Sequence, residues 1–268
     1  AELKILPVDE NGEWDLEQLD SLLDEKVKIV SVAHISNVLG IKNPVSILIE
    51  KAHRAGARVM LDGAQGIVHG DVDVQQLDCD FYAFSGHKLY GPTGTGVLYG
   101  KREILEEISP WMGGGDMVDT VSLYKTTYAP IPLKFEAGTP NFIGAAALGE
   151  AVNFIQQIDK NFIVEQEQLL TSSLLSALKE IDGLVIYGDS VNKLPIFSFN
   201  VEGVHHTDLA MLLDKMGIAV RTGHHCAQPL MEELGIEGTV RVSIAFYNTK
   251  EEIDRLIIGI KRVVTMFS

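Results

Sequence analysis

The chain has 268 residues, of which 46% are hydrophobic, so it is long enough to bury the core of one large domain or of two smaller ones. Its formal net charge of −15 argues against nucleic acid or an anionic membrane surface as the main partner. Only two cysteines are present, Cys79 and Cys226, and no apolar run approaches the ~20 residues of a spanning helix. A cytoplasmic protein without a disulfide framework is expected.

The first half of the chain alternates between strand and helix patterns. In order, these patterns predict a strand at 3–8, a helix at 15–24, a strand at 28–33, a helix at 44–55, and strands at 58–61, 80–84 and 96–99. Such alternation is typical of an α/β fold with a largely parallel sheet covered by helices. The glycines and prolines of residues 111–135 indicate a mobile loop, which we expect to lie over the functional site of the protein.

The second half predicts a smaller α+β domain. Its expected elements are helices at 143–157 and 162–181, strands at 184–187 and 196–201, a helix at 207–216, strands at 218–220 and 240–244, and a closing helix from residue 250. We therefore expect residues 1–142 to be part of a first, large domain. Residues 143–268 would form the linking helix and the small domain that carries the Cys226 loop.

Polar side chains follow three successive strands of the predicted sheet. They are Asn37 after the first strand, Asp62 and Gln65 after the second, and Ser85, His87 and Lys88 after the third. Because the carboxyl ends of parallel strands meet at one edge, these groups should converge where such sheets bind ligands. A lysine held there can act as a nucleophilic amine. The alternative is a surface lysine in a glycine-rich loop.

A lysine and an aspartate of this kind match the needs of pyridoxal phosphate. That cofactor bonds to a lysine amine through its aldehyde and pairs its ring nitrogen with an acid. Lys88 and Asp62 are the candidates, Ser85 and His87 offer phosphate donors, and Gln65 could donate to the ring oxygen. Alternatively, Asp62 caps the N-terminus of a helix.

A second group of reactive residues surrounds Cys226. The thiol lies in a Gly/His loop, where Arg221 or a protonated histidine could favour a nucleophilic thiolate. A metal site with His205 and His206 is the alternative, but neither CxxC nor HxxxH spacing supports zinc, and no metal is expected. A purely structural cysteine is a further alternative. Cys79, in contrast, is expected to be a packing residue.

Arg241 stands on the apolar strand at 240–244. A strand arginine that points inward suits a carboxylate, because its planar fork donates two parallel hydrogen bonds. A surface arginine on an edge strand is the alternative. The glycine-rich run at 91–96 lacks the spacing of a dinucleotide fingerprint or a Walker A loop.

Several of these motifs together resemble the pyridoxal-phosphate-dependent cysteine desulfurases, which are class-V aminotransferase-like proteins. The resemblance rests on Asp62-Gly63-Ala64-Gln65 and on the segments 85–94, 135–141 and 221–226. The short loop around Cys226 resembles the SufS-like group II branch. The likeness runs in order along the whole chain and implies fold type I of the pyridoxal-phosphate-dependent transferases.

The resemblance also implies a role for each candidate. Lys88 would carry pyridoxal 5'-phosphate covalently and move protons, Asp62 and Gln65 would contact its ring, and Ser85 and His87 would hold its phosphate. Thr139 would reach the cofactor of the partner subunit. Asn37 and Arg241 would hold the carboxylate of L-cysteine. Cys226 would take up the substrate sulfur as a persulfide, leaving L-alanine.

The implied partners are a second copy of the chain, in a homodimer, and a SufE- or SufU-like sulfur-acceptor protein for iron–sulfur cluster assembly. Members of the resembled family carry well over a hundred further residues before the point where this sequence starts, so an N-terminal segment is expected to be missing. Two alternatives stay open: a selenocysteine lyase or another pyridoxal-phosphate relative, and a catalytically silent fragment that acts as a binding partner.

Overall fold

The computed structural model describes residues 1–70 and 72–267 and divides into two compact units. The parallel-sheet unit comprises residues 24–33 and 45–157, and the antiparallel-sheet unit comprises residues 1–23, 34–44 and 158–267. The expected boundary at residue 142 falls at the start of a helix inside the first unit, whereas the units divide after residue 157. As a division between domains, that boundary stays a prediction.

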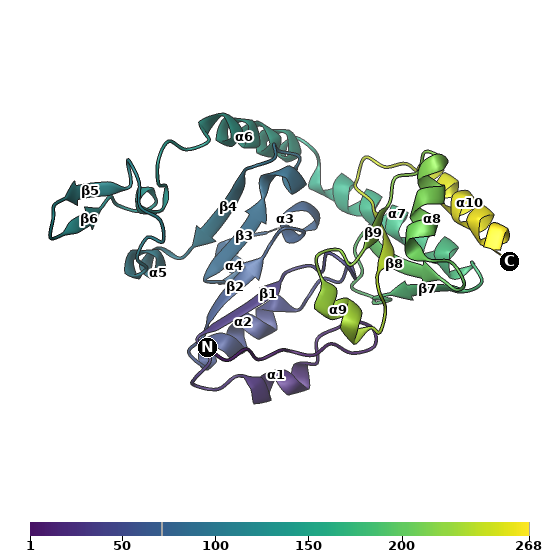
Figure 1. The fold of residues 1–268 in the computed structure, drawn as a ribbon, viewed down its shortest axis with the longest axis horizontal. Coiled ribbons are helices and arrows are strands. Elements are labelled where there is room, and N and C mark those ends of the chain that lie inside the picture. The colour runs from purple at the N-terminus through teal and green to yellow at the C-terminus, as the bar shows by residue number, and fades with distance from the viewer. Residues whose placement is uncertain (71, 268) are drawn as a thin grey trace. The chain divides into compact units, whose positions relative to one another are not determined.

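The parallel-sheet unit is built around four strands in the order β1-β2-β3-β4 (Figure 1). Its sheet strands are β1 (Ile29–Ala33), β2 (Arg58–Asp62), β3 (Phe81–Ser85) and β4 (Gly96–Gly100). Its helices are α2 (Val45–Arg54), α3 (Gly66–His69), α4 (Val74–Leu77), the 3-10 helix η1 (Gly86–Leu89), α5 (Arg102–Glu107), the 3-10 helix η2 (Leu133–Phe135) and α6 (Phe142–Gln156). The first three strands are parallel, as predicted, and β4 runs antiparallel to β3.

The register of this sheet determines where its polar side chains lie. Ala33 pairs with Asp62, and Asp62 pairs with Ala83, so the three parallel strands end at one edge. At the opposite end of the strands, His53 of α2 contacts the buried carboxylate of Asp80 at 2.8 Å, and the Val59 amide donates to the same oxygen at 2.7 Å. These bonds tie α2 to β2 and β3 where the strands begin.

The antiparallel-sheet unit packs three helices on a four-stranded sheet in the order β7-β8-β10-β9 (Figure 1). Its strands are β7 (Leu184–Tyr187), β8 (Ile196–Val201), β9 (Arg221–Gly223) and β10 (Thr239–Ser243). Its helices are α1 (Leu16–Leu22), α7 (Lys160–Lys179), α8 (His206–Lys215), α9 (Gln228–Glu233) and α10 (Lys250–Phe267). No helix in the described part of the chain is long and apolar enough to cross a membrane.

The core of this unit follows from helical periodicity. In α10, one face is apolar at spacings of three and four residues, and its buried members are Ile253, Leu256, Ile257, Ile260 and Val263. That face packs with Phe197 and Phe199 of β8 in one hydrophobic cluster. A second, smaller cluster joins Val38, Leu39 and Ile41 to Met231 of α9. This small cluster lies beneath the start of α9, next to the Cys226 loop.

Three sequence predictions of secondary structure were wrong. Residues 3–8 form no strand beyond a single bridge from Val8 to Trp14, because no neighbouring strand among the described residues pairs with them. The predicted strand at 218–220 is displaced to β9, where Arg221 is the first residue to pair with β10. Ile218 and Val220 instead pack against the large hydrophobic cluster.

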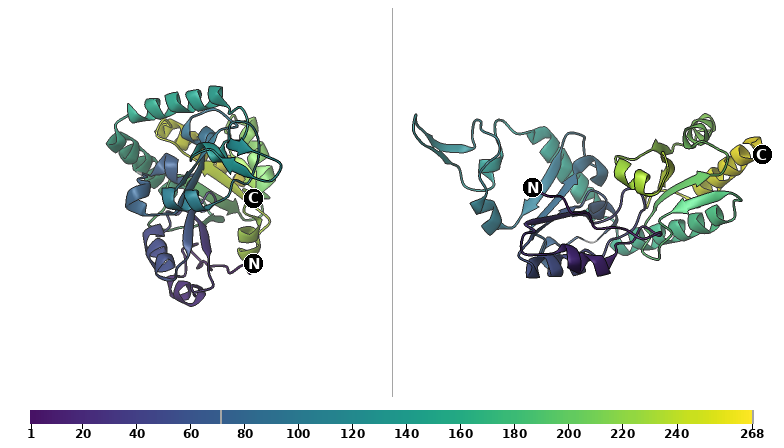
Figure 2. Two further views of the ribbon diagram at one scale, coloured as in Figure 1. Left: turned by 90° about the vertical axis from the view of Figure 1, so that its left-hand side faces the viewer. Right: turned by 60° about the horizontal axis from the view of Figure 1, so that its bottom comes forward.

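The third error concerns residues 111–135, which were expected to be a loop. They contain the antiparallel hairpin of β5 (Val118–Val121) and β6 (Thr126–Tyr128), which extends away from the four-stranded sheet of its unit (Figures 1 and 2). Ser122 closes the turn, because its backbone amide donates to the Lys125 carbonyl at 2.9 Å. The two strands are short and largely exposed, so they lack the apolar alternation that identifies a strand in sequence.

Candidate functional site

The parallel strands deliver Asp62 and Ser85 to one edge of the sheet, whereas Asn37 belongs to the antiparallel-sheet unit, so its expected convergence with them stays a prediction. Asp62 ends β2 and Ser85 ends β3, and the chain then turns into η1, which carries His87 and Lys88. Helix α3 follows Gln65 and packs against η1. His87 is exposed and Lys88 is half-buried. Within residues 1–70 and 72–267, no hydrogen bond or ion pair engages the Lys88 amine.

Asp62 does not cap a helix. Its Oδ1 accepts a hydrogen bond from the Ala64 amide at 2.9 Å, while the residue at the N-terminal cap of α3 is Gln65, whose side chain makes no capping bond. Asp62 is exposed, so its carboxylate is available to a ligand. The helix-capping alternative for Asp62 is therefore wrong.

Two glycines allow the backbone to pass closely at this edge. A Cβ at Gly63 would lie 1.9 Å from a ring carbon of Tyr82, which is buried beneath it. A Cβ at Gly86 would lie 2.4 Å from the Thr95 hydroxyl. Both contacts are shorter than any real side chain tolerates, so only glycine fits before Ala64 and before His87. The turns that present Asp62 and Lys88 thus depend on these two glycines.

The second group of site residues lies in the antiparallel-sheet unit. Arg241 of β10 and Arg221 of β9 are directly opposite each other in the strand register. Like charges in this arrangement repel, and within the described residues neither guanidinium has a carboxylate partner. Burial, followed by the positive charge of Arg221, lowers the pKa of Arg241. The pair forms a cationic site without its own counterion.

One N–H group of the Arg241 guanidinium is hydrogen-bonded within the protein, and another is not. Its Nη1 donates to the backbone oxygen of Asn37 at 3.0 Å, whereas its Nε is buried and has no hydrogen-bond partner among the described residues. Strand β10 lies between β8 and β9, so the alternative of an edge-strand arginine is wrong. A buried N–H group without an acceptor costs free energy, and a bound carboxylate would satisfy it.

Cys226 follows β9 in a tight loop. Arg221 donates from Nη2 to the Cys226 sulfur at 3.5 Å, and the Cys226 amide donates to Nδ1 of His224 at 3.2 Å. The thiol is exposed, unlike a packing cysteine. His225 and Cys226 both have left-handed backbones, with φ of 54° and 62°. Non-glycine residues adopt this conformation at a cost of about 1–2 kcal/mol each.

His225 anchors the loop from below. It is buried, and its Nε2 lies 2.9 Å from the Thr239 hydroxyl and 3.2 Å from the Thr239 carbonyl. Its own carbonyl accepts a hydrogen bond from Nδ2 of Asn37 at 2.8 Å. Burial and the nearby Arg241 guanidinium lower the pKa of His225 to about 4, so the ring is neutral at pH 7. Asn37, Arg241 and the Cys226 loop are thus joined by direct bonds.

The remaining sequence candidates lie apart from these bonds. Cys79 is fully buried, as expected, and burial raises the pKa of its thiol to about 11. His206 contacts the Thr222 hydroxyl at 2.6 Å, and His205 lies 3.6 Å from a Glu237 oxygen. No three metal-binding side chains gather anywhere in the described ranges. Thr139 is exposed and lies just before α6.

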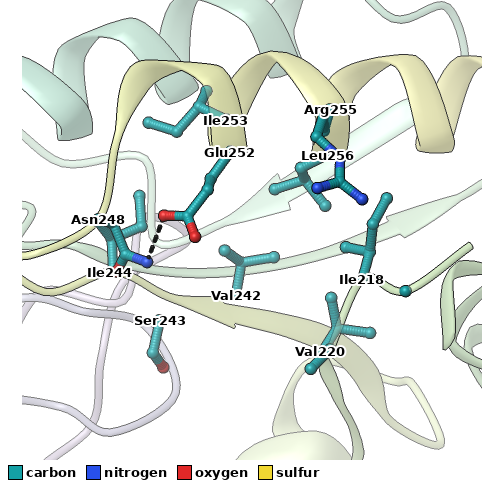
Figure 3. A pocket seen from close by; sticks show the side chains of 12 residues that line it. Ile218, Val220, Val242, Ser243, Ile244, Asn248, Glu252, Ile253, Arg255 and Leu256 are labelled. Carbon is teal, nitrogen blue, oxygen red and sulfur yellow. Dashed lines mark hydrogen bonds between the residues drawn. The ribbon is translucent and has the colours of Figure 1, made fainter.

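A cavity of about 300 Å³ opens between α10, β10 and residues 217–220 (Figure 3). Ile218, Val220 and Val242 line it, and the Asn248 amide bonds Glu252 at its rim at 2.9 Å. None of the predicted site residues lines this cavity. It is therefore distinct from the Cys226 loop.

Sequence reasoning missed the burial of three polar residues: His225 within the loop, and Ser198 and Lys193, which bond the turn at residues 36–40. Ser198 interrupts the apolar run of β8 between Phe197 and Phe199, and this was the one signal in the sequence. Lys193 and His225 are hydrophilic residues in polar stretches, where exposure is the usual outcome.

These features define a class of protein. Residues 1–256 match the family model for class-V aminotransferases, which covers well over half of the chain. The chain belongs to this family. The α/β architecture expected from the sequence, with a largely parallel sheet, is confirmed.

Among its relatives, the chain is similar to cysteine desulfurases. It is 50% identical over 264 residues to one from Cronobacter sakazakii, covering 98% of this chain and 65% of that protein. An enzyme of the same description from Escherichia coli is 49% identical over the same length and the same shares. The chain spans 65% of the length of these curated relatives.

Two solved structures have the same fold. The S-sulfonic acid form of the cysteine desulfurase CsdA from Escherichia coli superposes with a TM-score of 0.92 at 43% identity, covering 98% of this chain and 65% of that one. The apo cysteine desulfurase from Thermococcus onnurineus gives a TM-score of 0.94 at 38% identity, covering 99% of this chain and 66% of that one.

Proposed function

We propose that the protein is a cysteine desulfurase, which converts L-cysteine to L-alanine and keeps the sulfur as a persulfide on Cys226. One observation supports this most strongly: an exposed thiol lies 3.5 Å from the Arg221 guanidinium, and Arg221 is paired across the strands with Arg241, whose buried Nε lacks an acceptor. A thiol beside a pair of arginines that can bind a carboxylate is what an amino acid with a reactive sulfur requires. The similarity to cysteine desulfurases supports the same reaction.

The donor set at the edge of the parallel sheet fits pyridoxal 5'-phosphate. Lys88 offers an amine without a partner in the described chain, Asp62 an exposed carboxylate, and Ser85 and His87 donors for a phosphate. Gln65, at the start of α3, would donate to the ring oxygen. When bound, the cofactor supplies an electron sink next to the substrate carbon. Asp62 would keep the ring nitrogen protonated, and Lys88 would move protons at the α- and β-carbons.

The residues of the antiparallel-sheet unit would bind and cleave the substrate. The substrate carboxylate would accept from Nε and Nη2 of Arg241, because Nη1 is occupied by Asn37. Cys226 attacks the substrate sulfur, so an S–S bond forms and the C–S bond breaks. The electron pair of the C–S bond goes to the carbon, which takes up a proton to become the methyl group of alanine. The reaction needs no external oxidant, because sulfur is oxidised as carbon is reduced.

We also propose a homodimer in which Thr139 contacts the cofactor of the partner subunit. Thr139 is exposed in the single chain, as a residue that serves a partner must be. The persulfide would pass to a SufE- or SufU-like acceptor protein for iron–sulfur cluster assembly, consistent with the exposed position of Cys226. A reducing compartment such as the cytoplasm suits this chemistry, because both cysteines must remain free.

The test combines peptide mapping with product analysis. Protein supplied with pyridoxal 5'-phosphate and reduced with borohydride should carry the cofactor on Lys88. After incubation with L-cysteine, Cys226 should carry one additional sulfur, with one alanine released per sulfur transferred. Cys226→Ala should abolish both products while retaining the label on Lys88, and Cys79→Ala is the matched control. Alanine release that is unchanged in Cys226→Ala would remove the thiol from the reaction and refute the proposal.

A further inference from the structure

Three consecutive backbone carbonyls in the turn at residues 36–40 are each bonded by a side chain from a distant part of the sequence. The Asn37 oxygen accepts from Arg241, as described above, at 3.0 Å. The Val38 oxygen accepts from the Ser198 hydroxyl at 2.7 Å, and the Leu39 oxygen accepts from Nζ of Lys193 at 2.8 Å. A turn usually satisfies its carbonyls with backbone or water. Here side chains fix its position one residue after another.

The two additional donors are unusual for their surroundings. Ser198 is fully buried between Phe197 and Phe199 on β8. Lys193 is 9% exposed, and its ammonium also donates to the Gly188 carbonyl at 2.9 Å and lies 5.0 Å from the Phe197 ring. Burial lowers the pKa of Lys193 to about 8. Burying a hydroxyl and an ammonium is costly unless they are hydrogen-bonded, and each of the two donates one bond to the turn.

The same turn also contacts the Cys226 loop. Nδ2 of Asn37 donates to the carbonyl of His225, the residue that precedes the thiol. Val38 and Leu39 pack with Met231 in the small hydrophobic cluster, against which Ala227 also lies. A displacement of the turn would therefore move the loop on both its polar and its apolar sides.

We infer that Ser198 and Lys193 are positioning residues for the Cys226 loop and for the carboxylate site, acting through the turn at residues 36–40. Neither side chain bonds to Cys226 or to its neighbours. Each fixes a carbonyl within two residues of Asn37, and Asn37 bonds both Arg241 and His225. Their relevance to catalysis rests on the proposed desulfurase reaction, but their effect on the loop does not.

Hydrogen–deuterium exchange of the protein without substrate tests this inference independently of activity. We expect Ser198→Ala to accelerate exchange at residues 224–228 by about tenfold, the ratio that corresponds to one lost buried hydrogen bond. Exchange in the middle of α7, around Leu174, should stay within about twofold of the parent protein. Ser243→Ala is the matched control, because it makes the same change at an exposed position of neighbouring β10.

A double-mutant cycle identifies the route. If Ser198 acts through Asn37, then Ser198→Ala should accelerate loop exchange by less than about twofold in an Asn37→Ala background. Lys193→Met keeps the packing over Phe197 but removes the donor. It should also accelerate exchange at residues 224–228, and it replaces Ser198→Ala if that variant folds poorly. Loop exchange that is unchanged in both variants, or a tenfold effect that persists without Asn37, would overturn the inference.

Steady-state kinetics connect the loop to the reaction. With L-cysteine, Ser198→Ala should raise KM by about tenfold and leave borohydride labelling of Lys88 unchanged, because the carboxylate site loosens while the cofactor site does not. If the parent protein has no desulfurase activity, the proposed function fails, and the exchange experiment still decides whether Ser198 positions the loop. A changed Lys88 labelling in Ser198→Ala would overturn the selective role.

Discussion

Arg241 donates from Nη1 to the backbone oxygen of Asn37 at 3.0 Å, although 204 residues separate them in sequence. This bond orients the guanidinium, so that its buried Nε and its Nη2 are left for a ligand. The side-chain amide of Asn37 donates to the His225 carbonyl. Through these two hydrogen bonds, Asn37 links the carboxylate site at Arg241 to the backbone that carries the thiol.

Arg241→Lys should impair substrate binding because an ammonium cannot hold Asn37 and also offer two parallel donors to a carboxylate. We expect a loss of about 2–3 kcal/mol in transition-state stabilisation, or roughly 30- to 150-fold in kcat/KM, mostly through KM. Initial rates over a range of L-cysteine concentrations measure the change. The control is Arg255→Lys, which alters an exposed arginine that lines the separate cavity. Equal kcat/KM for both variants would show that Arg241 does not bind the substrate.

The two cysteines should differ strongly in reactivity. Cys226 is exposed, whereas Cys79 is fully buried and burial raises the pKa of its thiol to about 11. At pH 8 about one Cys79 thiol in a thousand would be ionised even if reagent could reach it. Iodoacetamide should therefore modify Cys226 at least about 100-fold faster than Cys79, as read by peptide mass spectrometry. Comparable rates in the folded protein would mean that the parallel-sheet unit opens around β3.

Buried neutral histidines should make the protein sensitive to mild acid. Burial, assisted by positive neighbours, lowers the pKa of both His34 and His225 from 6.5 to about 4. Between these values the unfolded chain binds more protons than the folded one, so the free energy of unfolding falls as pH drops from 6.5 towards 4. Lowering the pH from 7 to 5 should cost about 2 kcal/mol for each histidine.

Urea unfolding of His225→Gln at pH 7 and pH 5 tests this expectation. The substitution lowers stability at pH 7, because the bond to Thr239 is weakened. It should nevertheless reduce the stability difference between the two pH values by about 2 kcal/mol. His224→Gln, a change at the adjacent exposed histidine, is the control. An undiminished pH dependence in His225→Gln would show that His225 is protonated in the folded protein.

Two glycine substitutions should have opposite signs. Gly63→Ala places a Cβ 1.9 Å from the buried Tyr82 ring, so it should destabilise the protein by about 2–3 kcal/mol. Gly149→Ala has open space around it and lies inside α6, so it should stabilise by about 0.5–1 kcal/mol. Thermal unfolding midpoints of the two variants measure the contrast. A Gly63→Ala variant as stable as the parent would mean that the turn after β2 can shift away from Tyr82.

The sequence was sufficient for those parts of the fold in which local pattern and packing agree. Strands β7 and β8 have the predicted bounds, because their apolar runs are short and flanked by turn residues. The convergence of Asp62 with Ser85 was predictable because parallel strands end at one edge. The β5–β6 hairpin was not, since its stability comes from hydrogen bonds between exposed strands rather than from a buried face.

The candidate residues that would bind or react with a substrate could be predicted from their residue types. The residues that only hold the backbone in place could not. Arg241 and Cys226 stand out as a charge on an apolar strand and a thiol in a polar loop. Ser198 is marked only as a hydroxyl within the apolar run of β8, and Lys193 is not marked at all, because their roles consist of bonds to backbone carbonyls of a turn more than 150 residues away in sequence. Any side chain with a donor would be compatible with such a partner, so only the folded chain identifies it.

The left-handed backbones of His225 and Cys226 have a consequence for sulfur delivery. Two such residues in a row hold roughly 2–4 kcal/mol of conformational energy, which the bonds from Asn37 and to Thr239 must offset. These bonds therefore hold the loop in a backbone conformation of higher energy. We expect that loss of the Asn37 side-chain bond would let His225 and Cys226 leave the left-handed region more readily, so that the position of the sulfur becomes more variable.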